Sequence, residues 1–129
     1  MKRTTNDWIL SAESDLFLIH EIISRENLTH LSAFHAQQAI EKSFKAIIEE
    51  FGLGFVKTHS LEMLYNKVKD KITTEINSDL LILLDQLYID ARYPGELGLL
   101  PDGKPSISEA KQFYMLAKQL FEATKSTCK

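Results

Sequence analysis

A set of polar and aromatic side chains interrupts the apolar stripes of the predicted helices, and these residue types could bind an anionic ligand. The set consists of Asp15, His35, Gln38, Glu41, Lys45, His59, Arg92 and Tyr93. Arginine and lysine bind phosphate, tyrosine can stack on a nucleobase, and histidine can transfer a proton. The same side chains could instead lock the helices together, through ion pairs of Asp15 with Arg92 and of Glu41 with Lys45. The residues alone favour this structural role.

The segment Lys57-Thr58-His59 is a further candidate, because it directly precedes a predicted helix. The first backbone amides of a helix have no partner within the helix, and they attract negative charge. These residues are therefore expected to lie where an anion could be received.

Metal, cysteine and phosphate-loop chemistry are not indicated. The four histidines include no pair at the i, i+4 spacing that presents two metal ligands on one helix face. The single thiol, Cys128, is the penultimate residue, which is a poor position for a nucleophile. Neither a Gly-x-x-x-x-Gly-Lys loop nor a Gly-x-Gly-x-x-Gly turn occurs. We therefore predict no metal and no cofactor.

Composition limits the class of protein. The chain has 129 residues, a net charge of −3, 44% hydrophobic and 26% charged residues, which predicts one globular domain over residues 1–129. The acidic balance argues against binding nucleic acid through bulk positive charge. No apolar run approaches the roughly 20 residues of a membrane-spanning helix, and no targeting segment is visible. A cytoplasmic location without a membrane partner is expected.

The positions of proline and glycine predict the architecture. All three prolines and three of the five glycines lie between residues 94 and 105, and the first 93 residues lack proline. The apolar periodicity predicts five helices: one from Thr4 or Thr5, one over 29–51, one over 59–71, one capped by Asn77 or Ser78, and one after the capping box of Ser106 and Glu109. The fourth should be the most buried, being apolar on almost all sides. We predict an all-α, antiparallel up-and-down four-helix bundle with an additional short helix. The irregular segment 92–105 is expected to fold back over it.

The first predicted helix is apolar on more than one side. Its main stripe, expected to face the core, consists of Trp8, Ala12, Leu16, Ile19 and Ile23. Leu10, Phe17 and Leu18 lie off this stripe, which is typical of a helix at a subunit interface. The pattern therefore favours a homodimer.

Four blocks of the sequence together resemble the HEPN domain. They are Trp8…Ala12…Asp15-Leu16, the run from Phe34-His35-Ala36-Gln37-Gln38 to Ala46, Lys57-Thr58-His59-Ser60-Leu61, and Ala91-Arg92-Tyr93-Pro94. The resemblance implies an all-α bundle, usually a homodimer, with the fold of the substrate-binding domain of some nucleotidyltransferases. It also implies a minimal nucleotidyltransferase as partner, in a toxin–antitoxin pair.

The ribonuclease branch of that family carries Arg-x(4–6)-His, and this sequence departs from the pattern. No histidine follows His59, so Arg92 lacks its partner. The stretch from Arg25 to His30 does satisfy the pattern, but it lies between the first two predicted helices and is interpreted as a chance match. The leading hypothesis is a non-catalytic module that binds a nucleotide or RNA through the polar set named at the outset. Two alternatives stay open. One is a metal-independent RNA endonuclease in which His35 or His59 acts with Arg92, and the other is a purely structural dimerisation bundle.

Overall fold

The computed structural model describes residues 1–92 and 103–129, and the side chains of Ala91 and Arg92 lie outside the description. Tyr93 and most of the predicted irregular segment also lie outside the described residues. The α-helices are α1 (Arg3–Ile22), α2 (Thr29–Glu50), α3 (Leu61–Val68), α4 (Ser78–Arg92) and α5 (Ile107–Thr127). Short 3₁₀ turns, Glu26–Leu28 and Lys69–Lys71, precede α2 and follow α3. No strand occurs in the described part of the chain.

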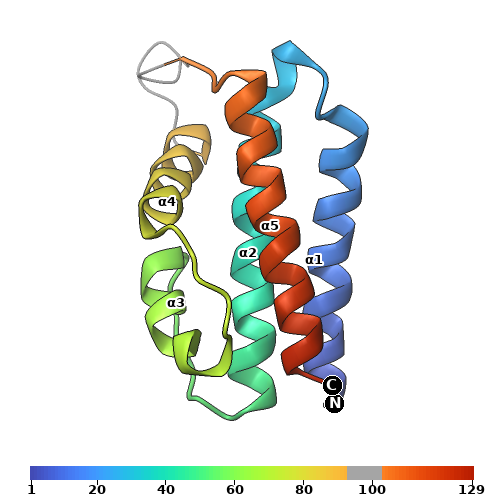
Figure 1. The fold of residues 1–129 in the computed structure, drawn as a ribbon, viewed down its shortest axis with the longest axis vertical. Helices are drawn as coiled ribbons and strands as arrows, with labels where there is room; N and C mark the ends of the chain where they lie inside the picture. Colours follow the sequence, from blue (N-terminus) through green and yellow to red (C-terminus); the bar gives the residue numbers. More distant parts are fainter. Residues whose placement is uncertain (93–102) are drawn as a thin grey trace.

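The four long helices alternate in direction, which confirms the predicted antiparallel bundle (Figure 1). α1 and α4 run one way, α2 and α5 run the other way, and the two termini lie side by side at one end. The short α3 lies below α4 in Figure 1 and packs against both α2 and α4. Helix α2 contacts each of the other four α-helices.

The start of α1 differs from the prediction. Neither Thr4 nor Thr5 caps the helix, which begins at Arg3 after an N-cap residue without a side-chain hydrogen bond. Instead, the Thr4 hydroxyl donates to Glu49 Oε1 at 2.7 Å and the Thr5 hydroxyl donates to Glu50 Oε1 at 2.9 Å. The two threonines therefore fasten the start of α1 to the end of α2.

Helix α2 ends in a Schellman motif built on Gly52, which has a positive φ of 58°. The amide of Leu53 donates to the carbonyl of Ile48 at 3.0 Å, and that of Gly52 donates to the carbonyl of Glu49 at 3.4 Å. A residue with a side chain would be strained at this φ, so glycine is needed for the turn. The chain is thereby turned back across α2 towards α3.

Two other helix starts were predictable from local sequence. Ser60 accepts a hydrogen bond from the amide of Met63 at 3.3 Å, so α3 begins at Leu61 rather than at the predicted residue 59. At α5, Ser106 and Glu109 exchange the two hydrogen bonds of a capping box, each at 3.0 Å. The predicted capping box is confirmed.

Burial is greatest in α2, not in α4 as predicted. α4 leaves Ile82, Leu83 and Ile89 between 40% and 50% exposed. Its apolar residues are numerous, but it packs mainly against α2 and α3 at the edge of the bundle, so part of its surface has no neighbour among the described residues. In α1, Leu10, Phe17 and Leu18 are also exposed, as expected for residues outside the core stripe. None of the described helices is long and apolar enough to cross a membrane.

Candidate ligand-binding cleft

Two charged clusters lie along the polar face of α2. Asp15 of α1 is the centre of the first. It is only 8% exposed. His35 Nδ1 lies 2.9 Å from Asp15 Oδ1, and Lys42 Nζ donates to Asp15 Oδ2 at 2.8 Å. Both carboxylate oxygens therefore have a partner on α2. Among the described side chains Lys42 supplies the cation at Asp15, and the predicted pairing of Asp15 with Arg92 falls on a side chain outside the description.

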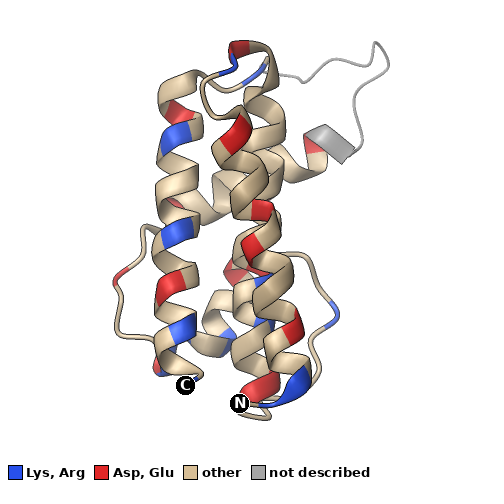
Figure 2. Ribbon diagram, turned by 90° about the vertical axis from the view of Figure 1, so that its right-hand side faces the viewer, with Lys and Arg blue, Asp and Glu red and all other residues tan. Residues whose placement is uncertain are grey.

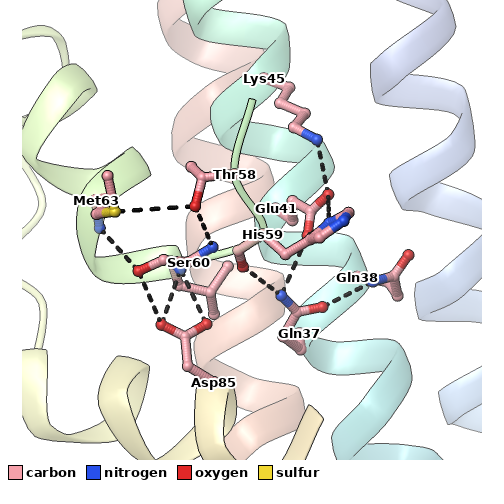
Figure 3. A network of polar contacts seen from close by, with 10 residues as sticks. Gln37, Gln38, Glu41, Lys45, Thr58, His59, Ser60, Met63 and Asp85 are labelled. Atoms are coloured by element: carbon pink, nitrogen blue, oxygen red, sulfur yellow. Dashed lines mark hydrogen bonds and ion pairs between the residues drawn. The ribbon is translucent and has the colours of Figure 1, made fainter. Parts of the chain in front are cut away.

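Glu41 is the centre of the second cluster (Figure 3). It is 5% exposed, and Lys45 Nζ donates to its Oε2 at 2.8 Å, which confirms the predicted ion pair. His59 Nδ1 lies 3.2 Å from both carboxylate oxygens, and Gln37 Nε2 donates to Oε1 at 3.2 Å. A buried carboxylate is stable only when its oxygens are hydrogen-bonded, and here they are.

Gln37, which was not among the predicted site residues, joins this cluster to the segment before α3. Its side chain is fully buried, and Nε2 also donates to the backbone carbonyl of His59 at 2.9 Å. Its Oε1 accepts from Gln38 Nε2 at 2.8 Å. The i, i+4 spacing of Gln37 and Glu41 on one helix was the available signal. The fully paired amide fixes the position of His59.

The N-terminus of α3 is already occupied by a carboxylate from within the chain. The amide of Leu61 donates to both Oδ1 and Oδ2 of Asp85, each at 2.9 Å, and the Ser60 hydroxyl lies 3.4 Å from Oδ2. Burial raises the pKa of Asp85, even though the hydrogen bonds from these amides act to lower it. The expectation of free amides next to 57–59 was therefore wrong, because Asp85 of α4 fills that position.

Aromatic contacts connect the two clusters to α4. Phe34 stacks on Tyr88 with ring centroids 5.4 Å apart and an interplanar angle of 14°. His59 packs against the same tyrosine at 5.7 Å, and His35 meets Phe34 edge-on at 5.2 Å. The structure thus brings together six of the predicted residues: Asp15, His35, Gln38, Glu41, Lys45 and His59. The other two, the Arg92 side chain and Tyr93, lie outside the described residues.

A cleft of about 790 Å³ lies beside the Glu41 cluster, between the start of α1, the end of α2 and the segment that follows α2. Its lining residues are Lys2, Trp8, Lys45, Ile48, Glu49, Gly52, Gly54, Phe55, Val56, Lys57, Thr58 and His59. Trp8 was expected in the core stripe of the first helix, but its ring is only partly buried and Lys45 Nζ lies 5.4 Å from the ring centroid. Phe55 belongs to no periodic pattern and is 90% exposed. Lys45 and His59 were predicted ligand-binding residues and 57–59 a predicted anion position, but no sequence signal placed Trp8 and Phe55 beside them.

The cleft carries a local positive charge in a chain whose net charge is −3. Three lysines and one glutamate line it, a formal charge of +2 with His59 neutral. Lys45 is paired with Glu41, and Lys2 Nζ donates to the backbone carbonyl of Glu49 at 2.9 Å. Lys57 has no hydrogen-bond or ion-pair partner among the described residues, so it is available to an anion. Within the described ranges, no group of three or more histidine, cysteine or acidic side chains could hold a metal ion.

Comparison with known proteins gives the family. The family model for the HEPN domain matches residues 5–127, nearly the whole chain. The crystal structure of an archaeal HEPN homologue is similar over 100% of both chains, with 25% sequence identity and a TM-score of 0.67. No curated protein is a significant match. Because the family model covers far more than half of the chain, this protein belongs to the HEPN domain family.

Proposed function

We propose that the chain is a single-domain, cytoplasmic module that binds a nucleotide or RNA and does not itself catalyse a reaction. The observation that carries this proposal is the cleft, which places aromatic rings next to lysine side chains. Its volume of about 790 Å³ falls within the range of small-molecule sites. Rings that stack on bases and cations that bind phosphate are the two elements of nucleotide recognition. Membership of the HEPN family supports a nucleotide- or RNA-related role.

The proposal of a non-catalytic role is supported by the departure from the ribonuclease pattern, because no histidine follows Arg92 at the spacing of the family's ribonucleases. One observation favours the alternative of an RNA endonuclease: the His59 side chain is 61% exposed and lines the cleft. A carboxylate that orients an exposed imidazole is the arrangement of a general base.

A direct comparison of binding with cleavage tests both functions. Purified protein is incubated with nucleotides and with structured and messenger RNA, and binding and chain scission are measured separately. We expect binding without scission. Scission that is lost in His59→Ala but retained in His20→Ala would support the endonuclease, and the absence of binding to every member of the panel would refute the proposed function.

We further propose that the module acts as a homodimer through the exposed side of α1. Leu10, Phe17 and Leu18 are 52%, 66% and 42% exposed there, and large apolar side chains grouped on one helix face are typical of interfaces. Analytical ultracentrifugation should give a dimer that Phe17→Glu converts to a monomer. The matched control is Met115→Glu on α5, which is 69% exposed and should leave the dimer intact. A wild-type monomer at all concentrations would refute this proposal.

A minimal nucleotidyltransferase is the proposed partner, in a toxin–antitoxin-like system. The support comes from the HEPN family, whose fold is shared by substrate-binding domains of nucleotidyltransferases. The test is co-expression with the product of the adjacent open reading frame. Co-purification of a small nucleotidyltransferase, together with relief of any growth defect that this chain causes alone, is expected.

A further inference from the structure

We infer that the cleft binds one nucleoside monophosphate group, with the base against Trp8 and Phe55 and the phosphate at Lys57. This inference rests on the proposed function and names the ligand class and the residues that would hold each part of it. The same chemical group occurs in a free mononucleotide and at a phosphorylated RNA end, and the experiment below distinguishes these two sources.

The base position follows from the two aromatic side chains of the cleft. Trp8 is partly buried and held by the start of α1, and Lys45 lies over its ring. Phe55 is 90% exposed and follows Gly54, which has a positive φ of 96°. The helix fixes one ring, whereas the other is carried by a segment outside any helix. Stacking of a base on an aromatic ring depends little on which base it is, so all four bases should bind.

The phosphate position follows from the one lysine of the cleft that has no partner among the described residues. Lys45 is held by Glu41, and Lys2 is held by the carbonyl of Glu49, but Lys57 is exposed and unpaired among the described residues. Binding a phosphate at Lys57 breaks no hydrogen bond or ion pair among the described residues. A charge-assisted contact of this kind is stronger than one between neutral groups.

The charge of the cleft favours a monophosphate over a triphosphate or a long RNA. The lining residues sum to +2, and inclusion of the adjacent Glu41 reduces this to +1. A phosphate monoester carries about −1.5 to −2 at neutral pH. Long RNA needs a continuous basic track, whereas Figure 2 shows acidic residues between or beside the basic ones and no continuous basic track on that side. One phosphate therefore matches the cleft best.

The chain offers a built-in probe, because Trp8 is its only tryptophan. The fluorescence of the full chain is titrated with AMP, adenosine, inorganic phosphate and ATP. We expect saturable quenching by AMP, at least about tenfold weaker binding of adenosine, no quenching by inorganic phosphate, and no tighter binding of ATP than of AMP. Tighter binding of ATP would overturn the monophosphate assignment.

Matched variants test the two halves of the site. Lys57→Ala should weaken the binding of AMP by about tenfold and leave the binding of adenosine unchanged. Lys111 is an exposed lysine of α5, and Lys111→Ala should change the binding of neither ligand. Phe55→Ala should weaken the binding of AMP and of adenosine by the same factor, and Met115→Ala should have no effect on either. Melting temperatures show whether each variant is folded. Wild-type AMP binding in both Lys57→Ala and Phe55→Ala would overturn the inference.

Oligoribonucleotides distinguish the two sources of the ligand and separate this inference from the proposed function. If a 5′-phosphorylated oligomer quenches Trp8 fluorescence at lower concentrations than AMP does, and its 5′-hydroxyl form does not, the site is assigned to RNA ends. If the phosphorylated oligomer binds no more tightly than AMP, the site is assigned to free mononucleotides. If no monophosphate group changes the fluorescence up to about 10 mM, but RNA binds wild type and Lys57→Ala equally, the inference fails and the proposed function stands. If RNA does not bind either, both fail.

Discussion

The polar face of α2 and the cleft at its C-terminal end contain similar residue types, but they differ in how completely these are paired. On the polar face, the carboxylates of Asp15 and Glu41 each accept from a lysine and lie beside a histidine. In the cleft, Lys57 has no partner among the described residues and Phe55 is 90% exposed. Residue type alone therefore does not locate a ligand site. A cation or an aromatic ring that the fold leaves unpaired is the better guide.

The largest expected effect is that of Glu41→Ala on stability. The substitution removes a buried carboxylate, leaves Lys45 without its acceptor, and leaves the buried amide of Gln37 with one of its two acceptors, the carbonyl of His59. Removal of one partner from a fully buried pair costs about 3–5 kcal/mol. We expect about 2–3 kcal/mol in the free energy of unfolding, because Lys45 can reach water. Urea denaturation measures this loss.

Glu41→Gln is the control for this prediction. It keeps the size of the side chain and one carbonyl acceptor, so it should cost less than the alanine variant. An alanine variant as stable as wild type would show that the polar face is not a structural lock, and the contrast with the cleft would fail.

Asp85→Ala should have a smaller effect, localised to α3. The substitution removes the acceptor of the Leu61 amide at the start of an eight-residue helix, and loss of a capping acceptor costs about 1–2 kcal/mol. Asp85→Asn keeps one acceptor oxygen and should cost less. Hydrogen exchange should show faster exchange in α3 than in α5 for the alanine variant. Uniform loss of protection in all helices would contradict a local role.

The same residue predicts a pH dependence of definite sign. Burial raises the pKa of Asp85 above its ordinary value of 3.8, so the folded chain binds this proton more tightly than the unfolded chain does. Its contribution to stability is therefore greatest below pH 3.8 and declines as the pH rises through the raised pKa. The Tm of wild type minus that of Asp85→Asn should fall across this window. A difference that rises with pH would contradict the prediction.

The smallest expected effects on the free energy of unfolding are those of replacing two lysines of the same cleft. Lys45→Ala leaves buried Glu41 without its cation and should cost about 1 kcal/mol. Lys57→Ala breaks no described contact and should change the free energy of unfolding by less than about 0.5 kcal/mol. Thermal melts of both variants under one condition give the comparison. Equal losses would show that Lys57 also has a structural partner.

The fold was predictable because its signals are local. The capping box at Ser106, the glycines after α2 and the apolar stripes each depend on residues a few positions apart. The site was less predictable, because its contacts join distant residues. Lys42 and Asp15 are 27 positions apart, and Leu61 and Asp85 are 24 apart. Which lysine pairs with which carboxylate depends on how the helices pack together, and helical periodicity does not specify that packing.

The most direct test of the central claim is an amide and indole NMR titration of the full chain with AMP. We predict that the largest chemical-shift changes occur in the cleft, at the Trp8 indole and at the amides of Gly54, Phe55 and Lys57. The amides around Asp15 and His35 should change little, because their side chains are already paired. Changes confined to the Asp15 and His35 region, or no changes at all, would contradict the account.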